Sequence, residues 1–212
     1  MILFFGAPGV GKGTQAKIVS SKLNLPHIST GDILREAITK KSWLGIKAKE
    51  TMNRGELVPD DIMTHLIDDV LKDPKCKNGF ILDGYPRSVH QAEVLQTIID
   101  VISDDPLIVI SLVADVDIIV DRLSQRRMCK ACGNIVNLNF LKNSLKCPSC
   151  GSIDTFIKRK DDEEDVIKNR LEIFEKTTSP VLHYYKEHDN IYEIDATLPV
   201  NEITKKILEI VT

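Results

Sequence analysis

The amino-acid sequence predicts an α/β fold in which a mainly parallel sheet of five strands is covered by helices on both faces. Four short apolar runs, bounded by turn residues and rich in β-branched or aromatic side chains, have the character of buried strands, and a weaker fifth lies near residue 26. These runs are MILFFG (1–6), PHIS (26–29), GFILD (79–83), PLIVISLVA (106–114) and NIYEID (190–195). Helical patterns separate them, and strands that alternate with helices form parallel sheets whose ligands sit beyond the carboxyl ends of the strands.

Helical periodicity is present in seven segments: 12–23, 31–40, 60–72, 88–102, 115–127, 162–188 and 200–211. Two stretches interrupt the alternation of strands and helices. Residues 29–58, the first insert, are helical without an intervening strand, and residues 125–162, the cysteine insert, hold four of the five cysteines. We expect both inserts to lie over the open edge of a core formed by residues 1–28, 59–124 and 163–212.

Length and composition favour one α/β domain with small inserts, because 212 residues can bury a substantial core. The formal net charge of −3 argues against a protein that covers much of its surface with nucleic acid or anionic membrane. No apolar run approaches the roughly 18 residues of a transmembrane helix, and MILFF lacks the positive lead-in of a signal peptide. We therefore expect a cytoplasmic monomer without nucleic-acid or membrane partners, in which structural disulfides are disfavoured.

A glycine-rich loop, GAPGVGKGT at residues 6–14, follows the first strand and opens the first helix. Its glycines let the backbone wrap around phosphate oxygens, and the lysine adds a mobile positive charge. The alternative is a tight turn without a ligand, but a turn alone requires neither the lysine nor four glycines. The residues expected to contact phosphates are Gly9, Val10, Gly11, Lys12, Gly13 and Thr14.

The loop departs in one place from the general phosphate-binding pattern, which has Ser or Thr directly after the lysine. Here Gly13 follows Lys12, and Thr14 comes next. The hydroxyl that usually binds Mg²⁺ is therefore displaced by one residue.

The string GAPGVGKGTQA resembles the start of adenylate kinases, and the resemblance continues along the chain. Further matching segments occur in the expected order: STGDILR (29–35), GELVPDDI (55–62), GFILDGYPRSVHQA (79–92), DRLSQRR (121–127) and KRKDDEEDVIKNRL (158–171). The cysteine insert resembles the long lid of the zinc-containing bacterial members. The resemblance implies a P-loop kinase core that catalyses MgATP + AMP ⇌ 2 ADP, with a helical AMP-binding insert and a zinc-ribbon lid.

Arginine is the residue type that such a reaction needs, because phosphoryl transfer depends on positive charge and alignment more than on a strong base. The resemblance implies that Arg35 and Arg87 hold the AMP phosphate. Three more arginines would converge on the phosphoryl group in flight: Arg126, Arg159 and Arg170. Taken singly, any of these could instead be an ordinary surface arginine.

Lys12 and Asp83 complete the catalytic set that the resemblance implies. Lys12 would bridge the donor phosphates and follow the charge of the transferring group. Asp83, at the carboxyl end of the strand GFILD, is placed to orient Mg²⁺ and its waters, although an aspartate before Gly84 could also serve only the turn.

Two nucleotide pockets follow from the same resemblance. The AMP pocket would comprise Thr30, Arg35, Glu56, Leu57, Val58, Gly84, Tyr85, Pro86, Arg87, Gln91, Arg159 and Arg170, with the Gln91 amide facing the adenine edge. The ATP site would add Arg122, Arg126, Ile135, Val136 and Leu198 to the phosphate loop. Two differences from common members of the family stand out: Val136 and Asn137 replace a Tyr-His pair, and Leu198 replaces a lysine.

The four cysteines of the insert form two CxxC pairs separated by 14 residues: Cys129, Cys132, Cys147 and Cys150. Four thiolates leave no position for water, so the pattern predicts a closed structural zinc site. Two disulfides or fortuitous cysteines are the alternative. Cys76 stands apart, and the five histidines show no metal-binding spacing.

Residues 121–160, which overlap most of the cysteine insert, are strongly positive, because they carry nine Lys or Arg and two Asp. A basic lid of this kind would be drawn onto polyphosphate. The run DDEED at 161–165 then favours a helix N-terminus and could pair with lid arginines, but a solvated acidic run fits it equally well.

Two rival functions stay open at this point. One is a nucleoside monophosphate kinase that uses another acceptor or donor, such as UMP, CMP or GTP. The other is a nucleotide-gated zinc-ribbon protein that binds RNA, although the insert offers only Phe140 and Phe156 as aromatic surfaces for stacking.

Overall fold

The computed structural model describes residues 1–102, 105–141, 144–186 and 191–212, and it confirms the predicted fold class. Five parallel strands form one sheet in the order β2-β3-β1-β4-β8. Their bounds are β1 Ile2–Phe5, β2 His27–Ser29, β3 Ile81–Asp83, β4 Ile108–Val113 and β8 Ile191–Asp195. Each of the five predicted strands is present, and residue 190 of the last lies outside the described residues.

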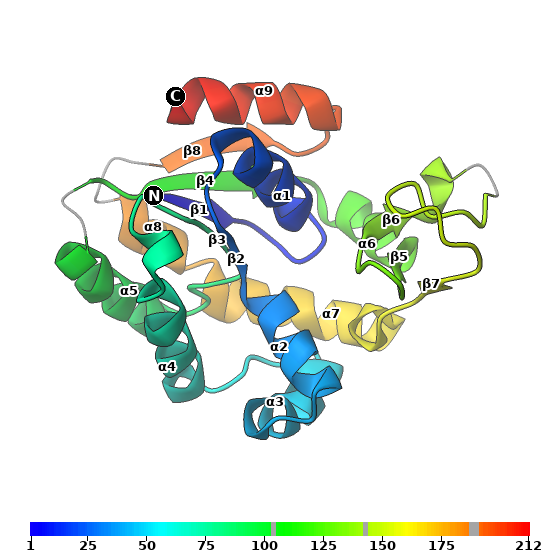
Figure 1. Ribbon diagram of the computed structural model, residues 1–212, viewed down its shortest axis with the longest axis horizontal. Helices are drawn as coiled ribbons and strands as arrows, with labels where there is room; N and C mark the ends of the chain where they lie inside the picture. The colour runs from blue at the N-terminus through cyan, green and yellow to red at the C-terminus, as the bar shows by residue number, and fades with distance from the viewer. Residues whose placement is uncertain (103–104, 142–143, 187–190) are drawn as a thin grey trace.

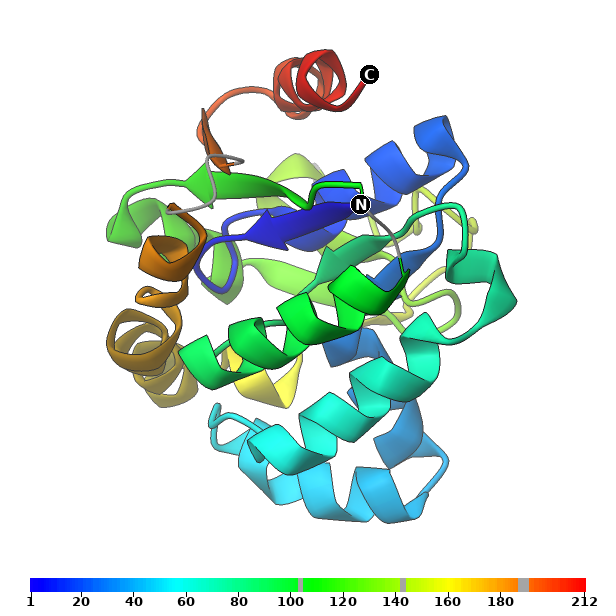
Figure 2. The same cartoon turned by 90° about the vertical axis from the view of Figure 1, so that its left-hand side faces the viewer.

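Helices cover both faces of this sheet, as Figures 1 and 2 show. On one face lie α1 (Lys12–Leu23) and α9 (Val200–Val211). On the other lie α4 (Asp60–Leu71), α5 (Val89–Ile102), α7 (Glu164–Ile173) and α8 (Val181–Lys186). A short 3₁₀ turn, η1 (Pro74–Cys76), follows α4, and α6 (Val116–Ser124) leads from β4 toward the cysteine insert. Within the described ranges, no helix combines the length and apolarity needed to cross a membrane.

The strand β1 shows how the sheet divides the apolar interior. Ile2 and Phe4 belong to the cluster under α1 and α9, whereas Leu3 and Phe5 belong to the cluster on the opposite face. Alternate side chains of a strand point to opposite faces, so a sheet buried on both sides needs continuous apolar runs. The sequence ILFF satisfies that requirement.

Two predicted helices are wrong in extent. The helix predicted over 115–127 ends at Ser124, because Arg126 already begins a strand of the cysteine insert. The helix predicted over 162–188 is divided into α7, a π-helical segment η4 (Phe174–Thr178) and α8. Pro180 has no N–H to continue a helical ladder, which separates η4 from α8. Residues 187 and 188 of that prediction lie outside the described part of the chain.

The first insert consists of α2 (Thr30–Thr39) and α3 (Trp43–Asn53), each begun by a serine cap. The side chain of Ser29 accepts from the Asp32 amide and that of Ser42 from the Gly45 amide. A Cβ atom at Gly45 would lie 2.1 Å from the Ala37 carbonyl oxygen. The two helices can therefore cross this closely only over a glycine.

The cysteine insert contains a small antiparallel sheet in the order β6-β5-β7. Its strands are β5 (Arg126–Cys129), β6 (Ile135–Asn137) and β7 (Phe156–Ile157), with the 3₁₀ turns η2 (Leu138–Phe140) and η3 (Lys160–Asp162) beside them. Neither apolar cluster of the core contains any of the described residues of this insert. Its described part is thus held by something other than the interior of the main sheet.

Candidate active site and metal centre

The loop between β1 and α1 depends on glycine at the positions that the sequence singles out. Gly6, Gly9 and Gly11 have φ angles of 134°, 86° and 120°, which disfavour other residues. A Cβ atom at Gly6 would also lie 2.3 Å from the Leu112 carbonyl oxygen. No side chain caps α1 at its N-cap, Gly11, so the first amides of the helix are available to an anion.

Lys12 lies inside this loop. Its Nζ donates to the carbonyl oxygens of Gly6 at 2.7 Å and Ala7 at 2.9 Å. Burial lowers the pKa of Lys12 from 10.5 to about 8, although the Asp83 carboxylate opposes the shift. The phosphate loop therefore holds a cation that can lose its proton only slightly above neutral pH.

Asp83 approaches the loop from the carboxyl end of β3. A Cβ atom at Gly13 would lie 3.1 Å from Asp83 Oδ2, so the missing side chain at Gly13 leaves room for this carboxylate. That geometry gives a physical reason for the glycine directly after Lys12. His27, one of the five histidines without metal-binding spacing, has its Nε2 atom 3.7 Å from Asp83 Oδ2.

Arg126 and Arg170 are held by the first two residues of the acidic run. Arg126 forms a bidentate ion pair with Asp162, whose side chain is fully buried. Arg170 Nη1 lies 3.0 Å from Asp161 Oδ2 and also donates to the Asp161 carbonyl oxygen at 2.8 Å. Asp161 and Asp162 are therefore not a solvated run, whereas Glu164 and Asp165 lie in the first turn of α7.

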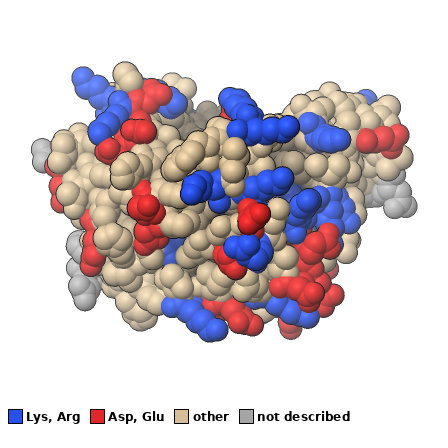
Figure 3. Space-filling model, turned by 90° about the horizontal axis from the view of Figure 1, so that it is seen from below, with Lys and Arg blue, Asp and Glu red and all other residues tan. Residues whose placement is uncertain are grey.

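Further positive charge gathers beside this pair. Arg35 donates to Asp32 Oδ1 at 2.6 Å, and Arg159 Nη2 lies 3.9 Å from the same atom. Burial, with repulsion from neighbouring arginines, lowers the pKa of Arg159 and of Arg170 to about 10. Figure 3, which shows the molecule from below, has Lys and Arg side chains gathered between the middle of the view and the cysteine insert at the right. Crowded buried cations are arranged to meet an anion.

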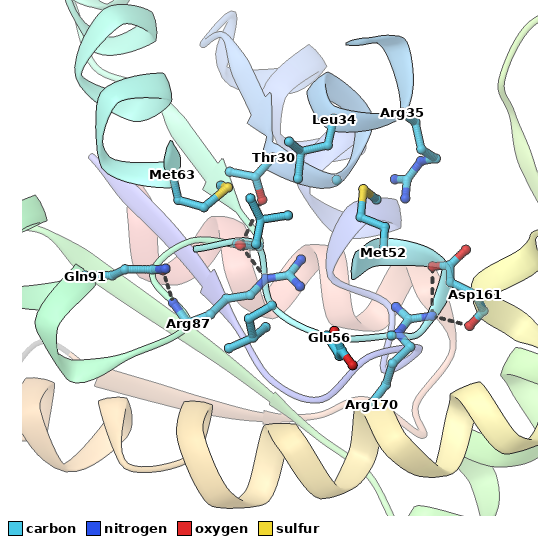
Figure 4. A pocket seen from close by; sticks show the side chains of 15 residues that line it. Thr30, Leu34, Arg35, Met52, Glu56, Met63, Arg87, Gln91, Asp161 and Arg170 are labelled. Atoms are coloured by element: carbon cyan, nitrogen blue, oxygen red, sulfur yellow. Dashed lines mark hydrogen bonds and ion pairs between the residues drawn. The ribbon is translucent and has the colours of Figure 1, made fainter. Parts of the chain in front are cut away.

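A pocket opens among α2, α3, α4 and the loop after β3. Of the predicted AMP-pocket residues, those that line it are Thr30, Arg35, Glu56, Leu57, Val58, Gly84, Arg87, Gln91 and Arg170. In Figure 4 the guanidinium groups of Arg35, Arg87 and Arg170 point toward one another across it. Six further residues of this lining were not predicted from the sequence: Gly31, Leu34, Met52, Gly55, Met63 and Asp161. Among these, Leu34 and Met63 lie on amphipathic helices, a signal that was available.

Three predicted pocket residues are placed outside this lining. Tyr85 and Pro86 are buried, with Tyr85 packed in the apolar cluster beneath the pocket. Arg159 lies toward the cysteine insert, close to Asp32. Tyr85 and Pro86 thus support the turn that presents Gly84 and Arg87.

The side-chain amide of Gln91 has two partners among the described residues. Its Oε1 accepts from the Arg87 amide at 2.7 Å, and its Nε2 donates to Asp60 Oδ1 at 2.6 Å. Arg87 is fixed further because its Nε donates to the Gly84 carbonyl oxygen at 2.7 Å. One lone pair and one N–H of the Gln91 amide are left for a ligand, so this side chain orients Arg87 as well as lining the pocket.

The four cysteines of the insert come together around one point. Their Sγ atoms all lie within 4.8 Å of one another, and they are the one such metal-binding group of His, Cys, Asp and Glu among the described residues. The distances Cys129–Cys150 and Cys132–Cys147 are both 3.7 Å. A tetrahedral site with Zn–S bonds of about 2.3 Å requires S–S separations of about 3.8 Å, whereas a disulfide requires about 2.05 Å. The geometry fits zinc and contradicts the disulfide alternative.

Each CxxC pair forms the same tight turn. Gly133 donates to the Cys129 carbonyl at 2.8 Å and Gly151 to the Cys147 carbonyl at 2.9 Å, with φ angles of 71° and 76° at the glycines. Those left-handed conformations explain why glycine follows each pair. Cys76 lies in η1, buried under α4 and apart from this centre.

Comparison with known proteins identifies the family of the chain. The family model for adenylate kinase matches residues 4–190. The adenylate kinase of Methanocella arvoryzae is 46% identical over 97% of this chain and 95% of its own. Those of Thermosipho africanus and Clostridium perfringens are 42% and 40% identical over 99% of this chain, covering 98% and 97% of their own lengths. The chain belongs to the adenylate kinase family.

The ATP-site residues that adenylate kinase resemblance implied are divided between the core and the insert. Arg122 donates to the carbonyl oxygens of Val10 at 3.1 Å and Ala196 at 2.8 Å, which joins the phosphate loop to the segment that carries Leu198. Ile135 and Val136 lie in β6 of the cysteine insert.

Asn137, where the resemblance implied a histidine, makes a contact within the insert itself. Its side chain accepts from the Asn139 amide at 2.8 Å and so caps the turn η2. This contact explains the asparagine without a nucleotide.

Proposed function

We propose that this chain is an ATP:AMP phosphotransferase that catalyses MgATP + AMP ⇌ 2 ADP. The observation that carries the proposal is the convergence of Arg35, Arg87 and Arg170 on one pocket, beside the loop that holds Lys12. The family assignment supports the same reaction.

In the proposed reaction, an oxygen of the AMP phosphate attacks the terminal phosphorus of ATP. The bond from that phosphorus to the bridging oxygen breaks, and the leaving group is ADP. The attacking oxygen is already ionised, so the protein supplies alignment and positive charge and no strong base. Arg87 and Arg35 would hold the acceptor phosphate, while Arg126, Arg159 and Arg170 with Lys12 would surround the phosphoryl group.

Recognition of the acceptor base is proposed for the apolar side of the pocket. Leu34, Met52 and Met63 line it and can pack against the faces of an adenine ring. The unused lone pair and N–H of Gln91 can meet an edge that carries both a donor and an acceptor.

Mg²⁺ would arrive with ATP and neutralise charge on its phosphates. The residues that would hold it or its waters are Thr14, at the start of α1, and Asp83, whose carboxylate already reaches the space beside Gly13. A carboxylate and a hydroxyl are oxygen ligands of the kind that this ion prefers.

Zinc in the cysteine insert is proposed as structural, since four thiolates complete its coordination. The residues flanking the two cysteine pairs, Arg126 and Arg159, would then move with a rigid lid that closes over the nucleotides and excludes water. A cytoplasmic location and a monomeric state belong to the same proposal. Reduced cysteines at metal spacing fit a reducing compartment.

An acceptor and donor panel tests the proposal. ADP formation is measured in a coupled assay with AMP, UMP, CMP or GMP as acceptor and ATP or GTP as donor. AMP with ATP is expected to give the highest kcat/KM. Faster turnover with UMP or CMP would replace the proposed substrate with a pyrimidine acceptor.

The RNA-binding rival is tested with the same protein. Binding of single-stranded RNA that weakens as salt rises, together with no ADP from ATP and AMP, would favour that rival. Rapid ADP formation without RNA binding supports the kinase.

A further inference from the structure

The four thiols of the metal centre have unequal surroundings. Cys129 and Cys147 are buried, whereas Cys132 and Cys150 are exposed. A hydroxyl group approaches one thiol of each kind: Thr155 Oγ1 lies 3.1 Å from Cys129 Sγ, and Ser152 Oγ lies 3.3 Å from Cys150 Sγ. Both distances are within hydrogen-bonding range for sulfur.

The backbone fixes Thr155 in this position. Its carbonyl oxygen accepts from the Lys130 amide at 2.7 Å. The next residue, Phe156, begins β7 and pairs directly with Cys129 in the small sheet. Main-chain contacts on both sides therefore hold the Thr155 hydroxyl against the Cys129 thiol. Ser152, by contrast, belongs to the turn of the second cysteine pair, two residues from Cys150.

A metal-bound thiolate has no proton, so the Thr155 hydroxyl must be the donor in this contact. We propose that Thr155 donates a hydrogen bond to the Cys129 thiolate that slows loss of the metal from the cysteine insert. The proposal deepens the structural zinc site proposed above and rests on it. Because Cys129 is buried, water cannot easily replace this donor once it is removed.

The position of Thr155 connects the metal to two of the proposed catalytic arginines. Strand β5 runs from Arg126 to Cys129, and Arg159 follows β7 by two residues. The Thr155 contact joins the end of β5 to the start of β7. The metal centre and this hydrogen bond therefore reinforce the pairing of β5 with β7, which sets how the two arginine-bearing segments lie against each other.

Zinc release provides the test. The zinc-loaded full chain is mixed with an excess of a chelator whose absorbance reports bound zinc, in the absence of nucleotides. Thr155→Val keeps the shape of the side chain and removes the hydroxyl, and it is expected to release zinc roughly tenfold faster. Thr155→Ser keeps the donor and should stay within about twofold of the parent. Ser152→Ala should have a smaller effect than Thr155→Val, because water can reach Cys150.

A second pair of variants removes the effect of packing. Thr155→Ser and Thr155→Ala both lack the methyl group and differ only in the hydroxyl, so faster release from Thr155→Ala alone supports the proposal even if Thr155→Val takes up no metal. With Co²⁺ in place of zinc, the thiolate-to-cobalt charge-transfer band should move to longer wavelength in Thr155→Ala and not in Thr155→Ser. Equal release rates and equal bands in that pair would overturn the proposal. These readouts contain no nucleotide, so a failure of the kinase assignment would leave them unchanged.

Discussion

The core and the cysteine insert are stabilised by different means. In the core, all five strands lie between two apolar clusters. In the insert, the buried apolar side chains of the described residues are Cys129, Val136 and Cys147, and two of these are metal ligands. A segment that buries so little apolar surface needs a crosslink or a metal to stay folded. The core is thus held together by a conventional apolar interior, whereas the insert depends on its cluster of four cysteines.

Replacement of Lys12 should have the largest effect, and it should leave both the core and the cysteine insert folded. Lys12→Met removes the cation of the phosphate loop, and kcat is expected to fall by about two to three orders of magnitude. Steady-state ADP formation measures the loss. Lys22→Met, at the exposed end of the same helix, is the matched control and should retain parental activity. A Lys12→Met enzyme with parental kcat would contradict the proposed role of the lysine.

Replacement of one of the four clustered cysteines should have the next largest effect. It should destabilise the cysteine insert and leave the core intact. Cys132→Ser is expected to abolish stoichiometric zinc and to speed amide hydrogen exchange across residues 126–157 by roughly two orders of magnitude or more. Exchange in β1 and β4 should change little, because their apolar partners are untouched. Mass spectrometry follows both regions in one sample. Cys76→Ala is the control and should keep one zinc per chain; equal loss of protection in core and insert would show that they fold as one unit.

Removal of the Gln91 amide should act on the acceptor alone. Gln91→Ala removes the side-chain acceptor of the Arg87 amide and the Gln91 donor to Asp60 Oδ1. The KM for AMP is therefore expected to rise about tenfold, near 1.4 kcal/mol, with the KM for ATP little changed. Gln96→Ala, on the same helix and paired with Asp100 across one turn, should leave both constants unchanged. An equal rise in both KM values would place Gln91 outside the acceptor pocket.

A pH dependence is the smallest expected effect. Burial sets the pKa of Lys12 at about 8, so the free protein loses this positive charge as pH rises through that value. ATP binding is favoured by the protonated lysine, and its affinity is expected to fall about fourfold between pH 7 and pH 8.5. Calorimetric titration with ATP measures it. AMP binding, which relies on arginines that stay charged in this range, serves as the control; an ATP affinity that rises with pH would contradict the assignment.

The features that could be predicted are those that short, continuous stretches of the sequence encode. Each apolar run became a strand because β-branched and aromatic residues flanked by turns have few other buried conformations. The spacing of the glycines predicts a loop that can wrap around an anion. The CxxC spacing predicts a tight turn that brings two thiols together. Residues 161–165 left two interpretations open, because burial cannot be read from an acidic run.

The sequence alone determined the α/β class, the glycine-rich loop and the cluster of four cysteines, since each depends on residues near one another in the chain. Only the tertiary structure decided that Asp162 is buried against Arg126, that Asp83 occupies the space beside Gly13, and that Gln91 is divided between Arg87 and Asp60. Thr155 reaches Cys129 across 26 residues in the same way. Contacts of this kind depend on how separate segments pack, and packing distances leave no periodic trace in the sequence.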